Sequence, residues 1–386
     1  MTKPEIIYFG NEWFGENKTS SHHVALRLSK EYKFVYVECP GLRAPRISSR
    51  DFRRIFTKLS NIISKPRITT QGFKVYTLFQ FPFHKYKLFS LVNQFLCKRQ
   101  VKRICSENNI DLPVLWFLVP HVGFLHKSID CSKSIYYCTD DYASFPGVKH
   151  NKISQLDKEL TSSVDLLFVT SNALYKLKEN SAKQIIYSPH GVDFEHFNKA
   201  ADNLDGLPQE ISSISSPIIG FFGLIEHWID EELIKYLANY NETWNIVLIG
   251  QCSHDKEIFE QHENIYLLGK KKYELLPAYA SKFNVGILPY KNNYQIKFCN
   301  PLKLKEYLAI GCPVVSVKFP EVSSYSHLIY IAENYQQFAN HIECALSSDT
   351  EYKKKERINS VRESTWDHVA TKVNNCLLYT SDAADE

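Results

Sequence analysis

The sequence of 386 residues lacks an apolar run long enough to cross a membrane, since stretches such as Val114–Val119 and Pro217–Ile225 have only the length of strands. The N-terminal residues MTKPEIIYFG lead directly into a strand-like run and show no signal-peptide pattern. The ten cysteines include no CxxC pair and no zinc-like spacing. A formal net charge of +4 is too mild to indicate nucleic-acid binding. These absences favour a cytoplasmic protein with reduced thiols.

A dinucleotide fingerprint is also missing. Gly10 and Gly15 follow the first apolar run, but their spacing is not that of a GxGxxG motif. The absence argues against a nicotinamide- or flavin-dependent oxidoreductase. The paired carboxylates Asp140 and Asp141 do not suggest a metal site, because adjacent residues at a strand end point to opposite faces. The sequence therefore predicts neither a bound cofactor nor a bound metal.

What is present is the composition of a globular chain with room for two domains, with 44% hydrophobic and 13% aromatic residues. Short, continuously apolar runs alternate with helical patterns, as in parallel sheets that are buried on both faces. The predicted strands are Glu5–Gly10, Phe34–Cys39, Phe73–Leu78, Val114–Val119, Ser134–Thr139, Asp165–Thr170, Gln184–Ser188, Ile218–Gly223, Asn245–Gly250, Ile265–Gly269, Val285–Tyr290, Pro313–Val317 and Leu328–Ala332. The predicted helices include Ser20–Lys30, Leu88–Glu107, Asn172–Glu179, Asp230–Ala238 and Tyr335–Leu346.

This order predicts an α/β fold with two Rossmann-like, doubly wound parallel-sheet domains that face a cleft. A polar stretch with Gly and Pro suits a linker between them. The predicted divisions are an N-terminal domain 1–198, a linker 199–216, a C-terminal domain 217–350, and a terminal segment 351–375. Residues 376–386, CLLYTSDAADE, resemble a translated adapter sequence from DNA library preparation and are expected to be an artefact.

The segment Asn300–Ser316, NPLKLKEYLAIGCPVVS, carries the most chemical information. Asn300 suits a helix N-cap and Pro301 the first helical position, while Gly311 is placed to end the helix. The helix start offers free N–H groups for a phosphate, with Lys303 adding a full charge. Glu306, one turn later, could accept hydrogen bonds from two vicinal hydroxyls. A nucleotide-diphosphate site is one interpretation, and an ordinary solvated Lys–Glu pair is the other.

This segment resembles the donor-site helix of GT-B glycosyltransferases close to glycosyltransferase family 4 (group 1), enzymes of cell-surface polysaccharide biosynthesis. Further similar segments follow in the same order over nearly the whole chain to Asn375. They are Tyr136–Gly147, Tyr187–Phe197, Gly220–Asp230 and Phe283–Tyr290, and Trp366 lies in a segment that resembles the family's terminal helix, which crosses back to the N-terminal domain. The resemblance implies transfer of a sugar from a nucleotide-diphosphate sugar, with retention of configuration and without a metal.

The resemblance also implies a set of donor-binding residues. In the family, the Glu at the position of Glu306 binds the donor ribose. Lys303 and the helix mouth at Asn300 and Leu302 would bind the diphosphate. The remaining candidates are Gly223 and Glu226 in the first loop of the C-terminal domain. Glu226 either faces the transferred sugar or is a surface group.

Two departures from the family pattern bear on activity. The Arg and Lys that many members carry in the first loop of the C-terminal domain are replaced by Leu224 and Ile229. The first of the two family acids, which contacts the donor sugar, is replaced by Phe298. Lys303 could supply the missing positive charge. These changes leave open a non-catalytic, nucleotide-sugar-binding subunit, and a nucleotide-sugar epimerase on the same fold is a further alternative.

In the N-terminal domain, His121 follows the strand Val114–Val119 at its carboxyl end. The resemblance implies a catalytic contact with the donor sugar, and the alternative is a structural histidine. The loop GNEWFG would lie on the acceptor side in GT-B enzymes. Asn11 and Trp13 are its candidate residues, with Trp13 either stacking on a sugar or packing the domain edge.

Residues 43–67 combine an amphipathic helical pattern with many cations. Apolar residues recur at helical spacing over Phe52–Ile63, and Asp51 is the sole acid in the stretch. One interpretation is peripheral contact with the anionic inner face of a membrane that carries a lipid-linked acceptor. The other is an ordinary core helix with a basic outer face. The predicted partners are thus a nucleotide-sugar donor and a glycan or lipid-linked acceptor, without nucleic acid.

Overall fold

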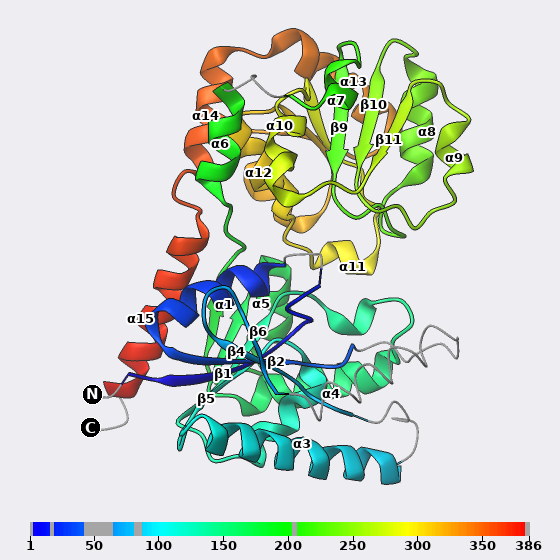
Figure 1. Cartoon of the computed structure of the whole chain (residues 1–386). Coiled ribbons are helices and arrows are strands. Elements are labelled where there is room, and N and C mark those ends of the chain that lie inside the picture. The colour runs from blue at the N-terminus through cyan, green and yellow to red at the C-terminus, as the bar shows by residue number, and fades with distance from the viewer. Residues whose placement is uncertain (1–2, 16–18, 42–64, 81–86, 203–206, 383–386) are drawn as a thin grey trace. The chain divides into compact units, whose positions relative to one another are not determined.

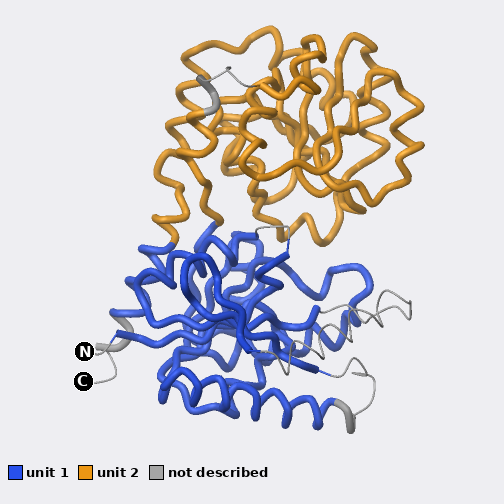
Figure 2. Tube along the Cα trace, viewed as in Figure 1, with its two compact units in different colours: residues 1–189, 370–386 blue, residues 190–369 orange. Residues whose placement is uncertain are grey.

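The computed structural model describes residues 3–15, 19–41, 65–80, 87–202 and 207–382, and the predicted helix Phe52–Ile63 lies outside these ranges. The chain divides into two compact units (Figure 2). Unit 1 comprises residues 1–189 and 370–386, and unit 2 comprises residues 190–369. The division at Pro189 and His190 precedes the linker expected from the sequence, since α6 (Phe194–Asp202) already belongs to unit 2.

Unit 1 contains a sheet whose described strands run in the order β3-β4-β2-β1-β5-β6-β7-β8. The strands are β1 (Glu5–Gly10), β2 (Lys33–Glu38), β3 (Arg67–Ile68), β4 (Lys74–Thr77), β5 (Val114–Phe117), β6 (Lys133–Cys138), β7 (Leu166–Val169) and β8 (Ile185–Tyr187). Every pairing in this sheet is parallel except that of β3 with β4. The central strands are buried along almost their whole length, which explains their continuously apolar sequences.

Helical elements connect these strands (Figure 1). They are α1 (Ser20–Glu31), α3 (Lys87–Glu107), the 3₁₀ helices η1 (Pro120–Lys127) and η2 (Tyr142–Ser144), α4 (His150–Ser163) and α5 (Asn172–Lys178). Between β1 and β5 the order of the strands reverses direction along the sheet. In doubly wound sheets, the carboxyl ends of the strands at such a point are where ligands bind.

Unit 2 contains a six-stranded, all-parallel sheet with the order β11-β10-β9-β12-β13-β14. Its strands are β9 (Ile218–Phe222), β10 (Asn245–Ile249), β11 (Ile265–Gly269), β12 (Val285–Leu288), β13 (Val314–Val317) and β14 (Tyr330–Ala332). The longer helices are α8 (Glu231–Tyr240), α12 (Leu302–Ile310), α13 (Tyr335–Ser348) and α14 (Glu351–Val361), and α15 (Trp366–Asp382) begins in this unit. The shorter elements are α7 (Gln209–Ser212), α9 (Glu257–Glu260), η3 (Tyr273–Leu275), α10 (Leu276–Ala280), α11 (Tyr294–Lys297) and η4 (Pro320–Tyr325).

Two parallel-sheet units confirm the α/β class predicted from the sequence, and every predicted strand is present with ends within two residues of those expected. In unit 2 the strand order reverses direction between β9 and β12. The loop after β9 and the segment that leads from β12 into α12 therefore start at the same edge of the sheet. Helix α15 starts at Trp366, in unit 2, and its residues from Ala370 onward belong to unit 1.

Candidate functional site

Helix α12 in unit 2 is enclosed almost completely. Every residue from Leu304 to Ile310 is buried, including the charged Lys305 and Glu306. The helix ends as predicted at Gly311, whose φ of 82° is in the left-handed region. The guanidinium of Arg357 donates from Nε and Nη2 to the Gly311 carbonyl oxygen, at 2.9 and 2.8 Å. Each buried charged side chain of such a helix needs a hydrogen-bond or ion-pair partner, because an unpaired buried charge is energetically costly.

The start of α12 differs from the prediction. The N-cap is Pro301 and no side chain caps the helix, whereas the sequence predicted Asn300 as the cap. Asn300 is buried and donates from Nδ2 to Oε1 of Glu321 at 2.8 Å. The side-chain amide of Asn300 thus hydrogen-bonds the buried carboxylate of Glu321 and does not cap α12. The first-turn N–H groups, which have no partner within the helix, belong to Leu302 and Lys303.

Lys303 and Glu306 form an ion pair on α12. Lys303 Nζ lies 2.8 Å from Glu306 Oε2, and only 8% of the Glu306 side chain is exposed. The same ammonium lies 4.8 Å from the centre of the Phe222 ring, at the end of β9. The structure thus brings the two central residues of the predicted site together and excludes an ordinary solvated pair.

The loop after β9 begins at Gly223, whose φ of 150° is one that side-chain-bearing residues rarely adopt. A Cβ placed there would lie 3.3 Å from Cε of Lys303. Gly250, at the end of β10, has a φ of 152°, and its Cβ would come within 1.7 Å of the Gly223 carbonyl oxygen. The two glycines allow the adjacent strand ends to meet closely beside Lys303.

The rest of this loop pairs with two neighbouring segments of the backbone. Ile225 forms a parallel bridge with Cys252, and Ile229 forms an antiparallel bridge with Tyr290. Ile229 is fully buried, so one of the two positions at which many family members carry a cation faces the core here. Leu224, at the other position, is half-buried. Lys303, on α12, brings a cation to this strand end.

Glu226 lies in the same loop but outside the Lys303–Glu306 pair. Its carbonyl oxygen is 2.7 Å from Nε2 of His254, and its carboxylate is 3.9 Å from Nδ1 of His227. Nδ1 of His254 lies 2.5 Å from the carboxylate of Glu231 in α8. These contacts fix the loop, and they leave both interpretations of Glu226 open because its carboxylate is partly exposed.

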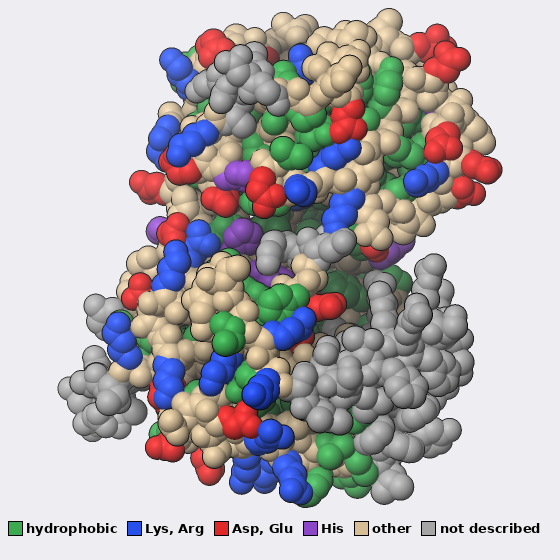
Figure 3. Space-filling model, in the orientation of Figure 1, with side chains coloured by type: hydrophobic (Ala, Val, Ile, Leu, Met, Phe, Trp, Pro, Cys, Tyr) green, Lys and Arg blue, Asp and Glu red, His purple; other side chains and the backbone are tan. Residues whose placement is uncertain are grey.

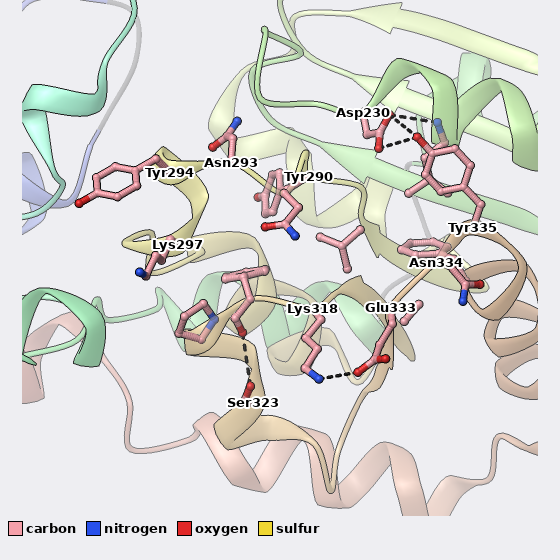
Figure 4. A pocket seen from close by; sticks show the side chains of 17 residues that line it. Asp230, Tyr290, Asn293, Tyr294, Lys297, Lys318, Ser323, Glu333, Asn334 and Tyr335 are labelled. Carbon is pink, nitrogen blue, oxygen red and sulfur yellow. Dashed lines mark hydrogen bonds and ion pairs between the residues drawn. The ribbon is translucent and has the colours of Figure 1, made fainter. Parts of the chain in front are cut away.

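A pocket of about 860 Å³ opens at the carboxyl ends of β12, β13 and β14. Among the interactions that Figure 4 marks along its wall, Tyr335 donates to the carboxylate of Asp230, and Lys318 pairs with Glu333. Tyr290 lines the same pocket. Hydroxyl, amide and charged groups of this kind can hydrogen-bond a polar ligand such as a sugar.

Tyr290, which lines this pocket, is a buried side chain. Burial raises the pKa of Tyr290 well above its ordinary value, and the charges of Cys299 and Glu306 raise it further. Burial also lowers the pKa of Lys305 to about 8, although Glu321 opposes this shift. The Lys305 ammonium donates to the carbonyl oxygen of His190, and so is a structural contact within unit 2.

Phe298, at the position of the missing family acid, is buried with 3% of its surface exposed. Its ring centre lies 5.0 Å from that of Tyr294 in an edge-on arrangement. A carboxylate at this buried position would need a partner. Phe298 thus contributes packing where the family has a polar contact.

In unit 1, His121 lies within η1, just after β5, and its side chain is half-buried. It therefore lies beyond the carboxyl end of a central strand, as predicted. Asp140 and Asp141 follow β6, the neighbouring strand. Burial raises the pKa of Asp140 to about 7. Among the residues that the structure describes, no group of three or more His, Cys, Asp or Glu side chains could hold a metal ion.

The structure favours the packing interpretation of Trp13 over the sugar-stacking one. The indole is only 4% exposed and lies 4.8 Å from the Phe73 ring and 5.0 Å from the Tyr36 ring, measured between ring centres. Its backbone N–H donates to Glu38 at 2.8 Å. Asn11 is exposed, and its carbonyl oxygen accepts a hydrogen bond from Tyr36. The exposed aromatic ring of this loop belongs to Phe14, with the Arg67 guanidinium 4.0 Å from its centre.

Several residues of the donor-side arrangement were not predicted. Tyr307 accepts a hydrogen bond from the Phe222 N–H at 3.1 Å, which ties α12 to the end of β9. His227 contacts the side chain of Gln295 in α11 at 3.1 Å. Gly250 and His254 complete the support of the loop after β9. The glycine that follows an apolar strand was the one local signal that could have identified Gly250.

Part of the chain matches a known protein family, and a longer stretch is similar to a curated protein. Residues 216–348 match the family described as Glycosyl transferases group 1. TuaH of Bacillus subtilis (strain 168), a proposed glycosyltransferase of teichuronic acid biosynthesis, is 24% identical over 340 residues, which cover 82% of this chain and 81% of TuaH. No helix among the described residues is long and apolar enough to span a membrane.

Solved structures show the same architecture over the whole chain. Sucrose-phosphate synthase from Thermosynechococcus elongatus superposes with a TM-score of 0.73 at 13% identity, covering 100% of both chains. HepE of Anabaena, in complex with UDP and glucose, gives a TM-score of 0.68 at 12% identity over 97% of this chain and 99% of HepE. Residues 216–348 therefore form a group 1 glycosyl transferase domain, and the chain as a whole has the GT-B fold, as the sequence resemblance predicted.

Proposed function

We propose that this protein transfers a sugar from a nucleotide-diphosphate sugar to a cell-envelope polysaccharide or glycolipid. The observation that carries the proposal is the buried Lys303–Glu306 pair beside Gly223. It combines a cation, a carboxylate and a helix start at the carboxyl edge of a parallel sheet. These are the groups that a diphosphate and a ribose require.

Before a donor binds, Lys303 and Glu306 satisfy each other. A diphosphate would compete with Glu306 for the Lys303 ammonium, because it carries more charge and lies at the helix mouth. The carboxylate of Glu306 would then accept hydrogen bonds from the two ribose hydroxyls. The exchange keeps each buried charge partnered in both states, which limits the cost of desolvating them.

During transfer, negative charge grows on the leaving diphosphate. Lys303 and the N–H groups of Leu302 and Lys303 stabilise that charge. In this proposal the bond between the anomeric carbon and the diphosphate breaks while the acceptor oxygen bonds to that carbon on the same face, and the leaving phosphate takes the acceptor proton. Configuration is therefore retained and no protein nucleophile is needed. Neither a metal nor another cofactor takes part. His121 contributes a contact to the donor sugar, and Glu226 lies near the transferred group.

The reaction takes place in the cytoplasm, with the protein in peripheral contact with the inner face of the membrane. The role suggested for TuaH supports a cell-envelope polysaccharide as the product. The basic sequence of residues 43–67 supports membrane contact. Of its cations, the structure describes Lys65 and Arg67, and both are exposed.

The test is release of nucleoside diphosphate from a panel of nucleotide sugars by the wild type and by Glu306→Ala, in membrane extract as the source of acceptor and with EDTA in a parallel series. We expect release that depends on acceptor, survives EDTA and falls at least tenfold in the variant. Loss of release with EDTA would refute metal independence alone. Conversion of the donor sugar without nucleotide release would instead identify an epimerase, and binding without any conversion would identify a non-catalytic subunit.

A further inference from the structure

Helix α3 is the longest helix of unit 1 that the structure describes, at 21 residues, and one of its faces is firmly packed. Cys97, Val101 and Ile104 are buried on that face, as is Asn93. These residues are spaced at three or four positions, so they form a single stripe against the unit. The helix is therefore anchored, and its opposite side is a fixed surface.

The first half of the opposite side carries large apolar side chains. Leu91 is 62% exposed, Phe95 is 63% exposed and Val92 is 36% exposed. Leu91 and Phe95 are four residues apart and therefore adjacent on the helix surface. Isolated exposed hydrophobic residues are normal on protein surfaces, but neighbouring ones on a single helix face indicate a contact surface.

The second half of the same side is cationic. Lys98 and Lys102 continue the stripe of Leu91 and Phe95, while Arg99 and Arg103 flank it. Arg103 pairs with Glu107, the sole acid of α3. Within the described parts of the chain, no carboxylate lies within ion-pair distance of Lys98, Arg99 or Lys102. Figure 3 shows basic and hydrophobic side chains side by side along the lower edge of unit 1, where α3 lies in Figure 1.

We propose that this surface, the α3 face (Leu91, Val92, Phe95, Lys98, Arg99, Lys102 and Arg103), binds the surface of an anionic lipid bilayer. The helix would lie flat, with Leu91 and Phe95 inserted at the level of the headgroups and the cations beside lipid phosphates. Charge complementarity favours a bilayer over a protein partner, because the cores of protein interfaces are depleted in lysine and contain few unpaired charges. Apolar insertion combined with several cations gives the two signals that stable membrane contact needs.

The α3 face shares no residue with the segment 43–67 or with the donor residues of unit 2. It would be a second surface for the membrane contact proposed above, and it lies within the residues that the structure describes. Its function does not depend on catalysis, so lipid binding and nucleotide binding can succeed or fail independently. Each cation near an anionic surface contributes about a fivefold gain in binding.

The experiment is sedimentation of the full-length protein with vesicles of phosphatidylcholine alone or phosphatidylcholine mixed with phosphatidylglycerol. We expect binding to the anionic vesicles only, weakening as salt is raised. The double variant Arg99→Gln/Lys102→Gln should bind about twenty-five-fold more weakly, on the basis of a fivefold loss for each cation. Leu91→Ser/Phe95→Ser should lose most binding at any salt concentration, because it removes the inserted side chains.

Matched controls come from α14 of unit 2, where Tyr352 and Lys355 are similarly exposed. Tyr352→Ser and Lys355→Gln should bind vesicles as the wild type does. Thermal melting of every variant establishes that it is folded. The proposal is overturned if the folded wild type does not sediment with anionic vesicles, or if the α3 variants bind them as well as the α14 controls do. Neither result would bear on nucleotide binding.

Discussion

Lys303 Nζ and Glu306 Oε2 lie 2.8 Å apart on a helix that is otherwise almost fully buried. On an exposed helix, such a pair contributes a few tenths of a kcal/mol. Here the carboxylate is only 8% exposed, so removal of its partner would leave a nearly buried charge. This dependence makes the pair sensitive to substitution and gives the donor-site proposal a direct test.

The first prediction concerns binding selectivity. Lys303→Ala should weaken binding of a nucleoside diphosphate at least tenfold and that of the corresponding nucleoside much less, because it removes a phosphate contact. Glu306→Ala should weaken both, because the ribose is common to both ligands. Isothermal titration calorimetry with both ligands measures the difference.

Lys235→Ala is the matched control, since Lys235 on α8 also pairs with a glutamate three positions away, Glu232, but the Glu232 side chain is 62% exposed. It should leave both affinities within twofold of the wild type. Equal affinities in the wild type, Lys303→Ala and Glu306→Ala would remove the site from α12.

The second prediction uses the glycines at the strand ends. Gly250→Ala should destabilise unit 2 by about 3 kcal/mol, because its Cβ would overlap the Gly223 carbonyl oxygen in addition to the backbone strain. Gly269→Ala, at a φ of 68° with open space around it, should cost only about 1–2 kcal/mol. Urea unfolding of the two variants gives the comparison. A Gly250 variant as stable as the Gly269 variant would contradict the packing of the two strand ends.

The third prediction separates packing from acceptor binding at Trp13. Trp13→Ala should lower the free energy of unfolding by about 3–5 kcal/mol, as expected for a buried aromatic side chain. Trp13→Phe, which keeps most of the volume, should lose far less and retain the wild-type KM for the acceptor. If a stable Trp13→Phe protein showed a strongly raised acceptor KM, the tryptophan would have a binding role after all.

The fourth prediction is a pH dependence that originates at Asp140. Burial raises the pKa of Asp140 from 3.8 to about 7, so between these values the folded state binds more protons than the unfolded state. The contribution of this group to the free energy of unfolding is therefore fully present below pH 4 and is lost as the pH rises to about 7. The full change is on the order of 2–4 kcal/mol.

Asp140→Asn carries no titrating group and should lack this change. The difference in unfolding free energy between the wild type and the variant, measured by urea denaturation from pH 4 to pH 8, isolates the effect from other carboxylates such as Asp165, whose pKa is lowered. A difference that stays constant over this range would show that Asp140 has an ordinary pKa.

The sheets were predictable because each buried strand is a short, continuous run of apolar residues in the sequence. Ile218–Phe222 and Asn245–Ile249 are buried along their whole length, so their apolar runs have no other suitable location. The strand Arg67–Ile68 was missed because it has two residues, both exposed, and hence no pattern. Helix α4 was missed for a related reason, since only Ile153, Leu160 and Thr161 are buried in its 14 residues.

The candidate site was predictable only in part. The sequence placed Lys303 and Glu306 on one helix and Gly311 at its end, because these signals are local. It could not show that Glu306 is buried, since the spacing is the same in a solvated pair. It also assigned Asn300 to the helix cap, because the partner of that amide, Glu321, lies 21 positions away in the sequence. Contacts of this kind depend on the tertiary fold.

The most direct measurement is calorimetric titration of the wild type and Glu306→Ala with UDP, GDP, dTDP and ADP. At least one of these ligands should bind the wild type with a micromolar dissociation constant. Binding should become at least tenfold weaker in the variant while the variant remains folded. If the folded wild type bound none of the four, or if Glu306→Ala bound as tightly as the wild type, the pair on α12 would not be the donor site.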